Sequence, residues 1–355
     1  MLERLLREQY GLSLRHARRA AEGAGSGTWF LRCGEGEYVM KFPAASGINH
    51  PEEEPRLCAF LRAQGIPACD FLKNRAGGCL SRDAAGRVFT VQRRLPGLTP
   101  EWNSASEALL MESAELLGKI HCVLRAYPAL PEGIGAGFFA GMTPQRALAS
   151  YRCSLAAAVR LGDTESAEEL RWRIDRMERF PAWTFDLSRL TLRNTHGDYF
   201  ISQFLCRDGR LTAVIDWTAA CVHPVVWELM RSFVYSAPCC ADGRIDRPLL
   251  ARYVRAYCRY GTLNDYDLEN LYRLYFYQID VCDYYGQYYT SGAANRAIYL
   301  RQARHAARLL KSMDMEGWDG FAGSVCEKAV DSGPRCVYNL KRLFQNIRFK
   351  TTVLL

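Results

Sequence analysis

The residues best suited to chemistry lie in two short segments of the second half of the chain. Thr195-His-Gly-Asp-Tyr-Phe-Ile-Ser-Gln-Phe204 is followed by Ala213-Val-Ile-Asp-Trp217. An Asp-Gly pair at 208–209 separates two apolar runs, which predicts a β-hairpin between the segments. The hairpin would bring Asp198, Gln203 and Asp216 to one end. Two carboxylates and an amide oxygen at one point suit a hard divalent cation and a hydroxyl that loses its proton.

The segment before residue 95 is short and rich in strand formers. It predicts a small sheet with one helix, followed by a break at Leu95-Pro-Gly97. The expected helices span 1–20 and 51–64. The expected strands span Trp29–Cys33, Tyr38–Phe42, 69–73 and 87–93.

The longer part after the break is mainly helical. Helices are expected at 104–127, 144–180 (one or two), 224–236, 246–260, 265–290 and 293–312. The order predicts an α+β fold with two unequal lobes. We assign residues 1–95 to the first lobe, 96–312 to the second, and 313–355 to an extension of unknown role.

The two chemical segments resemble the aminoglycoside phosphotransferase and choline kinase-like family, whose members have a bilobal protein-kinase-like fold. His196-Gly-Asp198 is similar to the family's catalytic loop, and Ile215-Asp-Trp217 to its metal-binding motif. Tyr38-Val-Met-Lys-Phe42 looks like its lysine strand. Segments 52–67, 87–97 and 116–121 look like the next helix, the hinge and the first large-lobe helix. The resemblance covers about residues 20–310, and some spore-coat proteins share it.

The resemblance implies an ATP- (or GTP-) and Mg²⁺-dependent kinase acting on a small hydroxylated molecule. Lys41 would bind the α- and β-phosphates, with Glu54 as its partner. Asp216 and Gln203 would hold Mg²⁺. Asp198 would orient the acceptor hydroxyl and take its proton.

Three further residues belong to the expected nucleotide site. Gly25 and Gly27 lie in a GxGxG sequence that is a candidate cover for the phosphates, and Gln92 lies on the strand that leads to the hinge.

Gln203 departs from the family pattern, which has asparagine at this position. The extra methylene moves the amide oxygen by roughly 1 Å, and a shift of this size can cost about 100-fold in rate. The alternative is therefore a catalytically impaired, kinase-like binding protein or a structural spore-coat protein. A protein kinase is disfavoured, because no Ala-Pro-Glu segment follows Asp216.

The acceptor site is expected among acids of the second lobe. Glu228 replaces an aspartate of the family pattern, and Asp280 and Asp283 lie in a tyrosine-rich helix. Such a wall would suit a cationic or polyhydroxylated acceptor, although a packed helix explains the same pattern. The sequence does not select an aminoglycoside over a sugar or an amino alcohol.

Composition excludes several other classes. Hydrophobic residues make up 49% and charged residues 24% of 355, as in globular proteins. No apolar run is long enough for a bilayer, so no membrane partner is expected. The net charge of +8 is concentrated in residues 1–100 and 333–355, while the middle is slightly acidic, which argues against a nucleic-acid partner. Fourteen cysteines without CxxC spacing indicate free thiols and a cytoplasmic location. The oligomeric state stays open.

Overall fold

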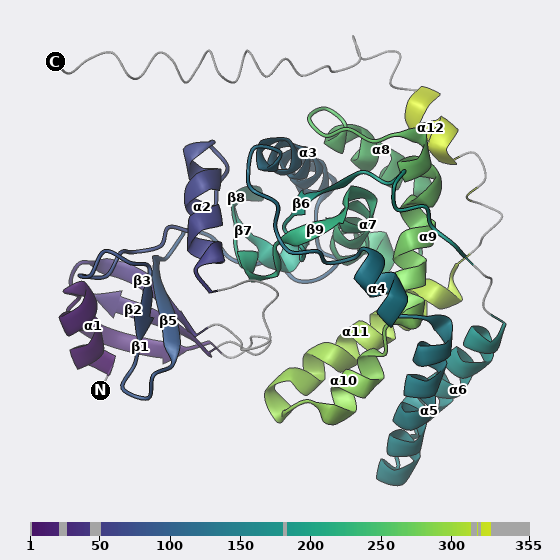
Figure 1. Ribbon diagram of the computed structural model, residues 1–355, viewed down its shortest axis with the longest axis horizontal. Coiled ribbons are helices and arrows are strands. Elements are labelled where there is room, and N and C mark those ends of the chain that lie inside the picture. The colour runs from purple at the N-terminus through teal and green to yellow at the C-terminus, as the bar shows by residue number, and fades with distance from the viewer. Residues whose placement is uncertain are drawn as a thin grey trace.

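The chain folds into two unequal lobes, as the sequence predicts (Figure 1). The computed structural model describes residues 2–20, 27–42, 51–179, 183–313, 318 and 321–327. The first lobe is a five-stranded antiparallel sheet in the order β1-β2-β3-β5-β4. Its strands are β1 (Leu14–Arg19), β2 (Gly27–Cys33), β3 (Gly36–Phe42), β4 (Leu80–Arg82) and β5 (Val88–Arg93). Its helices are α1 (Leu2–Tyr10) and α2 (Glu53–Ala63).

The core of the first lobe lies on one face of this sheet. Alternate residues of β3 and β5, such as Met40, Phe89 and Val91, are buried there with Leu6 of α1. This period-2 burial is what a half-covered sheet requires. It also fixes the face to which each neighbouring residue of β3 points.

Two expectations for the first lobe are wrong. The expected helix over residues 1–20 ends at Tyr10; Gly11 has a φ of +73°, and residues 14–19 form β1 instead. Pairing with β2 along this stretch outweighs the local helical pattern. The expected strand at 69–73 makes a single bridge, between Phe71 and Gln92, and β4 forms later in the chain.

The second lobe is mainly helical and holds two two-stranded sheets (Figure 1). The sheets pair β6 (Leu192–Thr195) with β9 (Cys221–Pro224), and β7 (Phe204–Arg207) with β8 (Arg210–Val214). The helices are α3 (Glu107–Leu124), α4 (Ala136–Gly141), α5 (Pro144–Leu161), α6 (Thr164–Glu178), α7 (Val225–Ser236), α8 (Arg247–Tyr257), α9 (Asp265–Val281), α10 (Tyr284–Thr290), α11 (Ala293–Lys311) and α12 (Phe321–Glu327).

Helix α7 is the centre of the second lobe, since every one of its residues is buried. The helix expected over 265–290 is in fact two. The chain breaks at Cys282–Asp283, where the Asp283 side chain accepts the backbone N–H of Gly286 and starts α10.

Part of the expected C-terminal extension packs on the second lobe. The rings of Trp318 and Tyr272 stack with centroids 4.4 Å apart, and Phe321 of α12 is buried beside them. The basic residues of 333–355 lie outside the described residues. The assigned boundaries at 95 and 312 remain predictions.

Two expectations from composition can be compared with the described residues. No helix among them is long and apolar enough to cross a bilayer. The twelve cysteines from Cys33 to Cys282 form no disulfide.

A buried histidine makes the stability of the second lobe dependent on pH. His305 of α11 packs against Tyr235, with ring centroids 4.7 Å apart. Burial, reinforced by Arg308, lowers the pKa of His305 to about 3. The unfolded chain therefore binds a proton below its ordinary pKa near 6.5 that the folded chain does not. We expect this group to lower the free energy of unfolding by about 2 kcal/mol between pH 6.5 and pH 4.5.

Urea denaturation across this pH range measures the effect. His305→Phe should flatten the pH dependence, whereas the same substitution at the exposed His16 should leave it unchanged. Equal slopes for wild type and His305→Phe would contradict the assignment.

Candidate active site

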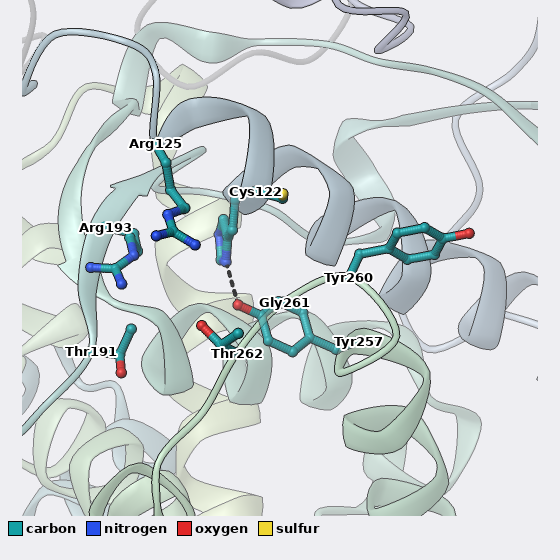
Figure 2. A pocket seen from close by; sticks show the side chains of 9 residues that line it. Cys122, Arg125, Thr191, Arg193, Tyr257, Tyr260, Gly261 and Thr262 are labelled. Atoms are coloured by element: carbon teal, nitrogen blue, oxygen red, sulfur yellow. Dashed lines mark hydrogen bonds between the residues drawn. The ribbon is translucent and has the colours of Figure 1, made fainter. Parts of the chain in front are cut away.

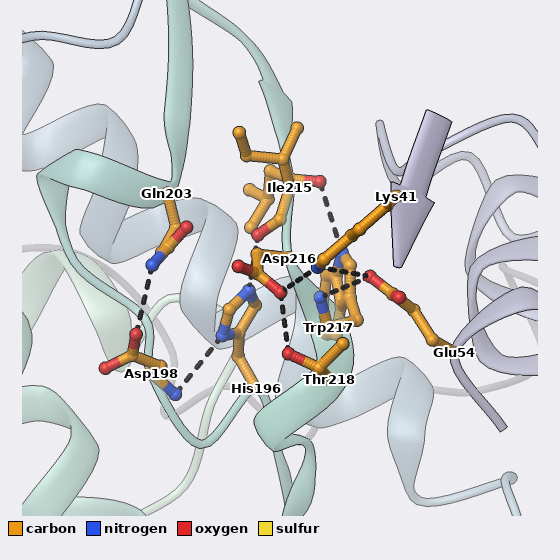
Figure 3. A network of polar contacts seen from close by, with 10 residues as sticks. Lys41, Glu54, His196, Asp198, Gln203, Ile215, Asp216, Trp217 and Thr218 are labelled. Carbon is orange, nitrogen blue, oxygen red and sulfur yellow. Dashed lines mark hydrogen bonds and ion pairs between the residues drawn. The ribbon is translucent and has the colours of Figure 1, made fainter. Parts of the chain in front are cut away.

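A lysine from the first lobe meets an aspartate from the second (Figure 3). Lys41 on β3 forms an ion pair with the Oδ1 atom of Asp216, which follows β8. Its Nζ atom also lies 3.7 Å from the Oε1 atom of Glu54 on α2. Lys41 is only 7% exposed. The structure thus brings these three expected site residues together.

The opposite charges of Lys41 and Asp216 support each other. Burial favours a neutral lysine, but Glu54 and Asp216 outweigh it and raise the pKa of Lys41. Burial also favours a neutral Asp216, but Lys41 outweighs it and lowers the pKa of this carboxyl. The two groups therefore stay charged at neutral pH. A buried fixed cation of this kind is suited to holding an anionic ligand.

Asp216 keeps one oxygen free for a ligand. Its backbone has a φ of +62°, a conformation that aspartate tolerates better than most residues. The Oδ1 atom binds Lys41 and accepts the Thr218 hydroxyl at 2.6 Å. The Oδ2 atom has no hydrogen-bond partner among the described residues, and the side chain is 39% exposed. Glu54 fixes the next residue by accepting the backbone N–H of Trp217 at 3.1 Å.

The loop that carries Asp198 is held from below by Glu228 of α7. The Oε1 atom of Glu228 accepts the backbone N–H of Gly197 at 2.6 Å, and Oε2 that of His196 at 3.3 Å. His121 of α3 lies 2.8 Å from the same Oε2 atom. Glu228 has no exposed surface, so it positions the loop from inside the protein.

His196 also supports the loop. Its Nε2 atom donates to the carbonyl of Ile215, and its Nδ1 atom accepts the backbone N–H of Asp198 at 3.2 Å. The ring is fully buried and packs on Trp217, with centroids 4.5 Å apart. These contacts join the Asp198 loop to the Asp216 loop.

Gly197 permits this close approach of the two loops. Its φ is +79°, and a Cβ atom there would lie 1.9 Å from the carbonyl oxygen of Ala219. We expect Gly197→Ala to lower the free energy of unfolding by at least about 3 kcal/mol, because clash adds to backbone strain. Urea denaturation measures the change.

The matched control is Gly65→Ala. Gly65 has a φ of +78°, but nothing lies within 4 Å of its added Cβ atom. This variant should lose only about 1 kcal/mol. Equal losses of unfolding free energy in Gly197→Ala and Gly65→Ala would contradict this. They would mean that the Asp198 and Asp216 loops move apart without an energetic cost.

Both carboxylate oxygens of Asp198 accept hydrogen bonds. Arg231 of α7 donates to Oδ1 from Nη2 at 2.5 Å and from Nε at 3.1 Å. The amide nitrogen of Gln203 donates to Oδ2 at 3.0 Å. The Asp198 side chain is 30% exposed, so a ligand can still reach it. In Figure 3 the amide oxygen of Gln203 lies on the side of Asp216.

Arg231 is the functional candidate that sequence reasoning missed. Its guanidinium lies between aromatic rings, 5.0 Å from the centroid of Phe200 and 4.9 Å from that of Tyr235. Asp198 outweighs the effect of burial and raises the pKa of Arg231. One signal was available, since Arg231 is the single cation in the mainly apolar helix 225–236. A buried arginine needs a partner.

The acids expected at the acceptor site are all engaged elsewhere. Glu228 is buried beneath the loop, as described above. Asp280 receives both Nε and Nη2 of Arg176, each at 2.7 Å. Asp283 caps α10 and accepts the hydroxyls of Ser150 and Ser154. The structure therefore does not bring these three acids together with Asp198 at an open surface.

The remaining candidates lie in the first lobe. Gly25 lies outside the described residues, and Gly27 opens β2 opposite Phe42. Gln92 lies on β5 opposite Val39 of β3, and its amide oxygen is buried with no hydrogen-bond partner among the described residues.

A model of the phosphotransferase enzyme family (APH) matches residues 16–272. The chain belongs to this family. The match contains Lys41, Glu54, Asp198, Gln203 and Asp216 and ends within α9. No curated protein sequence matches the chain well enough to count as a relative.

Solved structures of several kinases and phosphotransferases share the fold at low sequence identity. An amicoumacin kinase in complex with AMP-PNP, Ca²⁺ and Ami is 12% identical, with a TM-score of 0.52, over 83% of this chain and 87% of its own. A spectinomycin phosphotransferase in complex with ADP and spectinomycin is 12% identical, with a TM-score of 0.55, over 91% and 97%. A microcompartment-associated aminopropanol kinase is 14% identical, with a TM-score of 0.55, over 91% and 97%.

Proposed function

We propose that this member of the phosphotransferase family moves the γ-phosphate of ATP (or GTP) to a hydroxyl of a small molecule, with Mg²⁺. The observation that carries the proposal is the meeting of Lys41 and Asp216 across the cleft, with Asp198 on the neighbouring loop. In phosphoryl transfer the protein itself makes and breaks few covalent bonds. The reaction needs fixed charges at the phosphates and a group that orients the attacking hydroxyl.

The site has the oxygen ligands that Mg²⁺ prefers. The free Oδ2 atom of Asp216 and the amide oxygen of Gln203 would hold the ion. Among the described residues no group of three or more His, Cys, Asp or Glu side chains could hold a metal. That is the expected pattern for an ion shared with substrate phosphates. Bound Mg²⁺ would neutralise charge on the phosphate oxygens.

The nucleotide would lie between the lobes. Lys41 would bind its phosphates, with Glu54 holding the lysine in place. The amicoumacin kinase is solved with AMP-PNP and Ca²⁺, and the spectinomycin phosphotransferase with ADP. These ligands support a nucleotide and a divalent cation in this chain as well. Gly25, Gly27 and Gln92 remain candidate nucleotide contacts.

Asp198 would orient the acceptor hydroxyl and take its proton. Arg231 and Gln203 hold the carboxylate at both oxygens. A hydroxyl donor adds to these bonds readily, because a carboxylate offers about four lone-pair sites. Positioning of this kind supplies much of the rate in reactions that bring two groups together.

The described acids argue against a polycationic acceptor. Glu228, Asp280 and Asp283 are all satisfied by other partners, and Asp198 itself is paired with an arginine. A polyamine-like antibiotic would find none of these carboxylates unpaired. We therefore propose a neutral or anionic hydroxylated metabolite.

The alternative is a kinase-like protein without turnover, such as a structural coat protein. Gln203 is the observation that favours it. The hydrogen bond between the Gln203 amide and Asp198 favours the active kinase, because it shows that the longer side chain still reaches the loop aspartate.

A panel of hydroxylated metabolites, scored by ADP release, tests the proposal. It should include sugars, amino alcohols, hydroxy acids and aminoglycosides. We expect turnover with at least one neutral or anionic acceptor and none with aminoglycosides. Tight Mg-nucleotide binding without turnover on any acceptor would favour the non-catalytic alternative.

Arg231 provides a separate prediction about turnover. Lysine keeps the charge but cannot place two N–H groups on Asp198. We expect Arg231→Lys to lower kcat roughly 10- to 100-fold, while the Kd for Mg-AMP-PNP stays within threefold. Steady-state kinetics and calorimetry measure the two quantities.

The control is the same Arg→Lys substitution at Arg176, which also makes two hydrogen bonds to an aspartate but lies away from Asp198. Arg176→Lys alters the pair with Asp280 and should leave kcat unchanged. An Arg231→Lys enzyme with normal kcat would show that the two hydrogen bonds from Arg231 to Asp198 are not needed for phosphoryl transfer.

A further inference from the structure

A small concave site lies in the large lobe (Figure 2). It is formed by the C-terminal part of α3, by strand β6 with the residue before it, and by the turn that follows α8. The cavity itself is small, about 20 Å³, which is room for about one water molecule. It opens to solvent, so a ligand would lie at its mouth, against the side chains that line it.

Two guanidinium groups give the cavity its charge. Arg125 from the end of α3 and Arg193 from β6 both line it, and Figure 2 draws both side chains. Neither has an acidic partner within 4 Å among the described residues; the one bond that Arg193 donates goes to the carbonyl of Leu192. Nearby Arg259, by contrast, is paired with Glu115. Two uncompensated like charges around one hollow attract an anion.

No Asp or Glu side chain lines this cavity. Asp267 contacts one of the lining residues, Thr191, but it is fully buried. Its oxygens accept the N–H and hydroxyl of Thr191 and the backbone N–H of Asn264. The charge of Asp267 is thus committed to the start of α9. The hydroxyl of Thr262 adds a neutral group that an oxyanion can use.

We propose that this cavity binds a small phosphate-bearing anion, either inorganic phosphate or a phosphate monoester. The planar fork of arginine matches phosphate oxygens with two parallel N–H bonds, and two such forks are available. This proposal concerns a surface separate from the nucleotide cleft and stands whether or not the chain transfers phosphate.

The back wall of the cavity is joined to the catalytic loop. The Nδ1 atom of His121 lies 2.9 Å from the Tyr257 hydroxyl, and its Nε2 atom lies 2.8 Å from Glu228. Glu228 in turn accepts the backbone N–H groups of His196 and Gly197. An anion held against this wall therefore stabilises the folded loop by mass action.

Isothermal titration calorimetry at near-physiological salt is the test. One titration uses sodium phosphate and the other uses glycerol 3-phosphate. Saturating AMP-PNP and Mg²⁺ in the cell keep the ligand out of the nucleotide cleft. We expect a Kd of about 1 mM or below for at least one ligand. Arg193→Gln and Arg125→Gln should each weaken binding at least tenfold.

The control variant is Arg160→Gln, at the exposed end of α5. It should bind as the wild type does. Heat from phosphate supports free phosphate as the ligand, and heat from glycerol 3-phosphate alone supports a monoester. Absence of binding by the wild type would overturn the proposal. Wild-type affinity in both Arg125→Gln and Arg193→Gln would also overturn it. So would a loss of affinity in Arg160→Gln as large as that in the two cavity variants.

Discussion

Asp216→Asn should weaken the binding of Mg-ATP by about 100-fold or more, while the protein keeps its fold. The substitution removes the charged oxygen that faces the cleft, and changing even an outer partner of a metal ligand costs about 10- to 100-fold. It also removes one of the two anions that hold Lys41. Glu54 remains 3.7 Å from the lysine, so the buried cation keeps a partner and the lobe does not unfold. Calorimetry with AMP-PNP, with and without Mg²⁺, measures the loss.

The matched control is Asp208→Asn on the turn between β7 and β8. The Asp208 side chain is 90% exposed, and its backbone has a φ of +52° that asparagine adopts readily. It should bind Mg-AMP-PNP as the wild type does. If Asp216→Asn retains full metal-dependent affinity, the metal is held elsewhere and the proposed site is wrong.

Asp198→Asn should lower kcat by about 1,000-fold and leave nucleotide binding within threefold. A positioned general base contributes roughly 100- to 10,000-fold. The amide is close in size to the carboxylate, but it cannot take a proton from the acceptor hydroxyl. It also presents an NH₂ group to Arg231 or to Gln203, both of which are donors, so the side chain loses its fixed orientation. Steady-state kinetics on the acceptor found in the metabolite panel measure kcat.

Asp198→Asn is compared with Asp208→Asn, which should turn over normally. A kcat within tenfold of wild type for Asp198→Asn would exclude Asp198 as the group that activates the hydroxyl. Loss of nucleotide binding in the same variant would indicate instead that the loop has collapsed. The two readouts therefore separate chemistry from structure.

Much of the fold follows from local patterns. The hairpin of β2 and β3, helix α2 and the turn at Asp208–Gly209 each depend on strand formers, first-turn acids or turn residues close together in the chain. Strand β1 could not be predicted in the same way. Its six residues form a strand because β2 offers free backbone groups, and that partner is reached only after the chain turns back.

The site shows the same division. Sequence order and the family resemblance indicated Lys41, Glu54, Asp198, Gln203 and Asp216, because motifs in catalytic loops are short and continuous. The acceptor acids were a weaker inference, since whether an acid is free depends on partners far along the chain. Arg176, for example, lies more than 100 residues from Asp280.

Local sequence patterns predicted the two-lobed fold and indicated the proposed residues of the transfer site, because those residues stand in fixed spacing around single turns and strands. How their charges are paired depends on the folded chain. It brought Arg231 onto Asp198, placed Glu228 beneath the loop, and left Arg125 and Arg193 without acidic partners around one hollow. Charge pairing acts over a few ångströms in space, and no spacing along the chain records which side chains folding will bring that close.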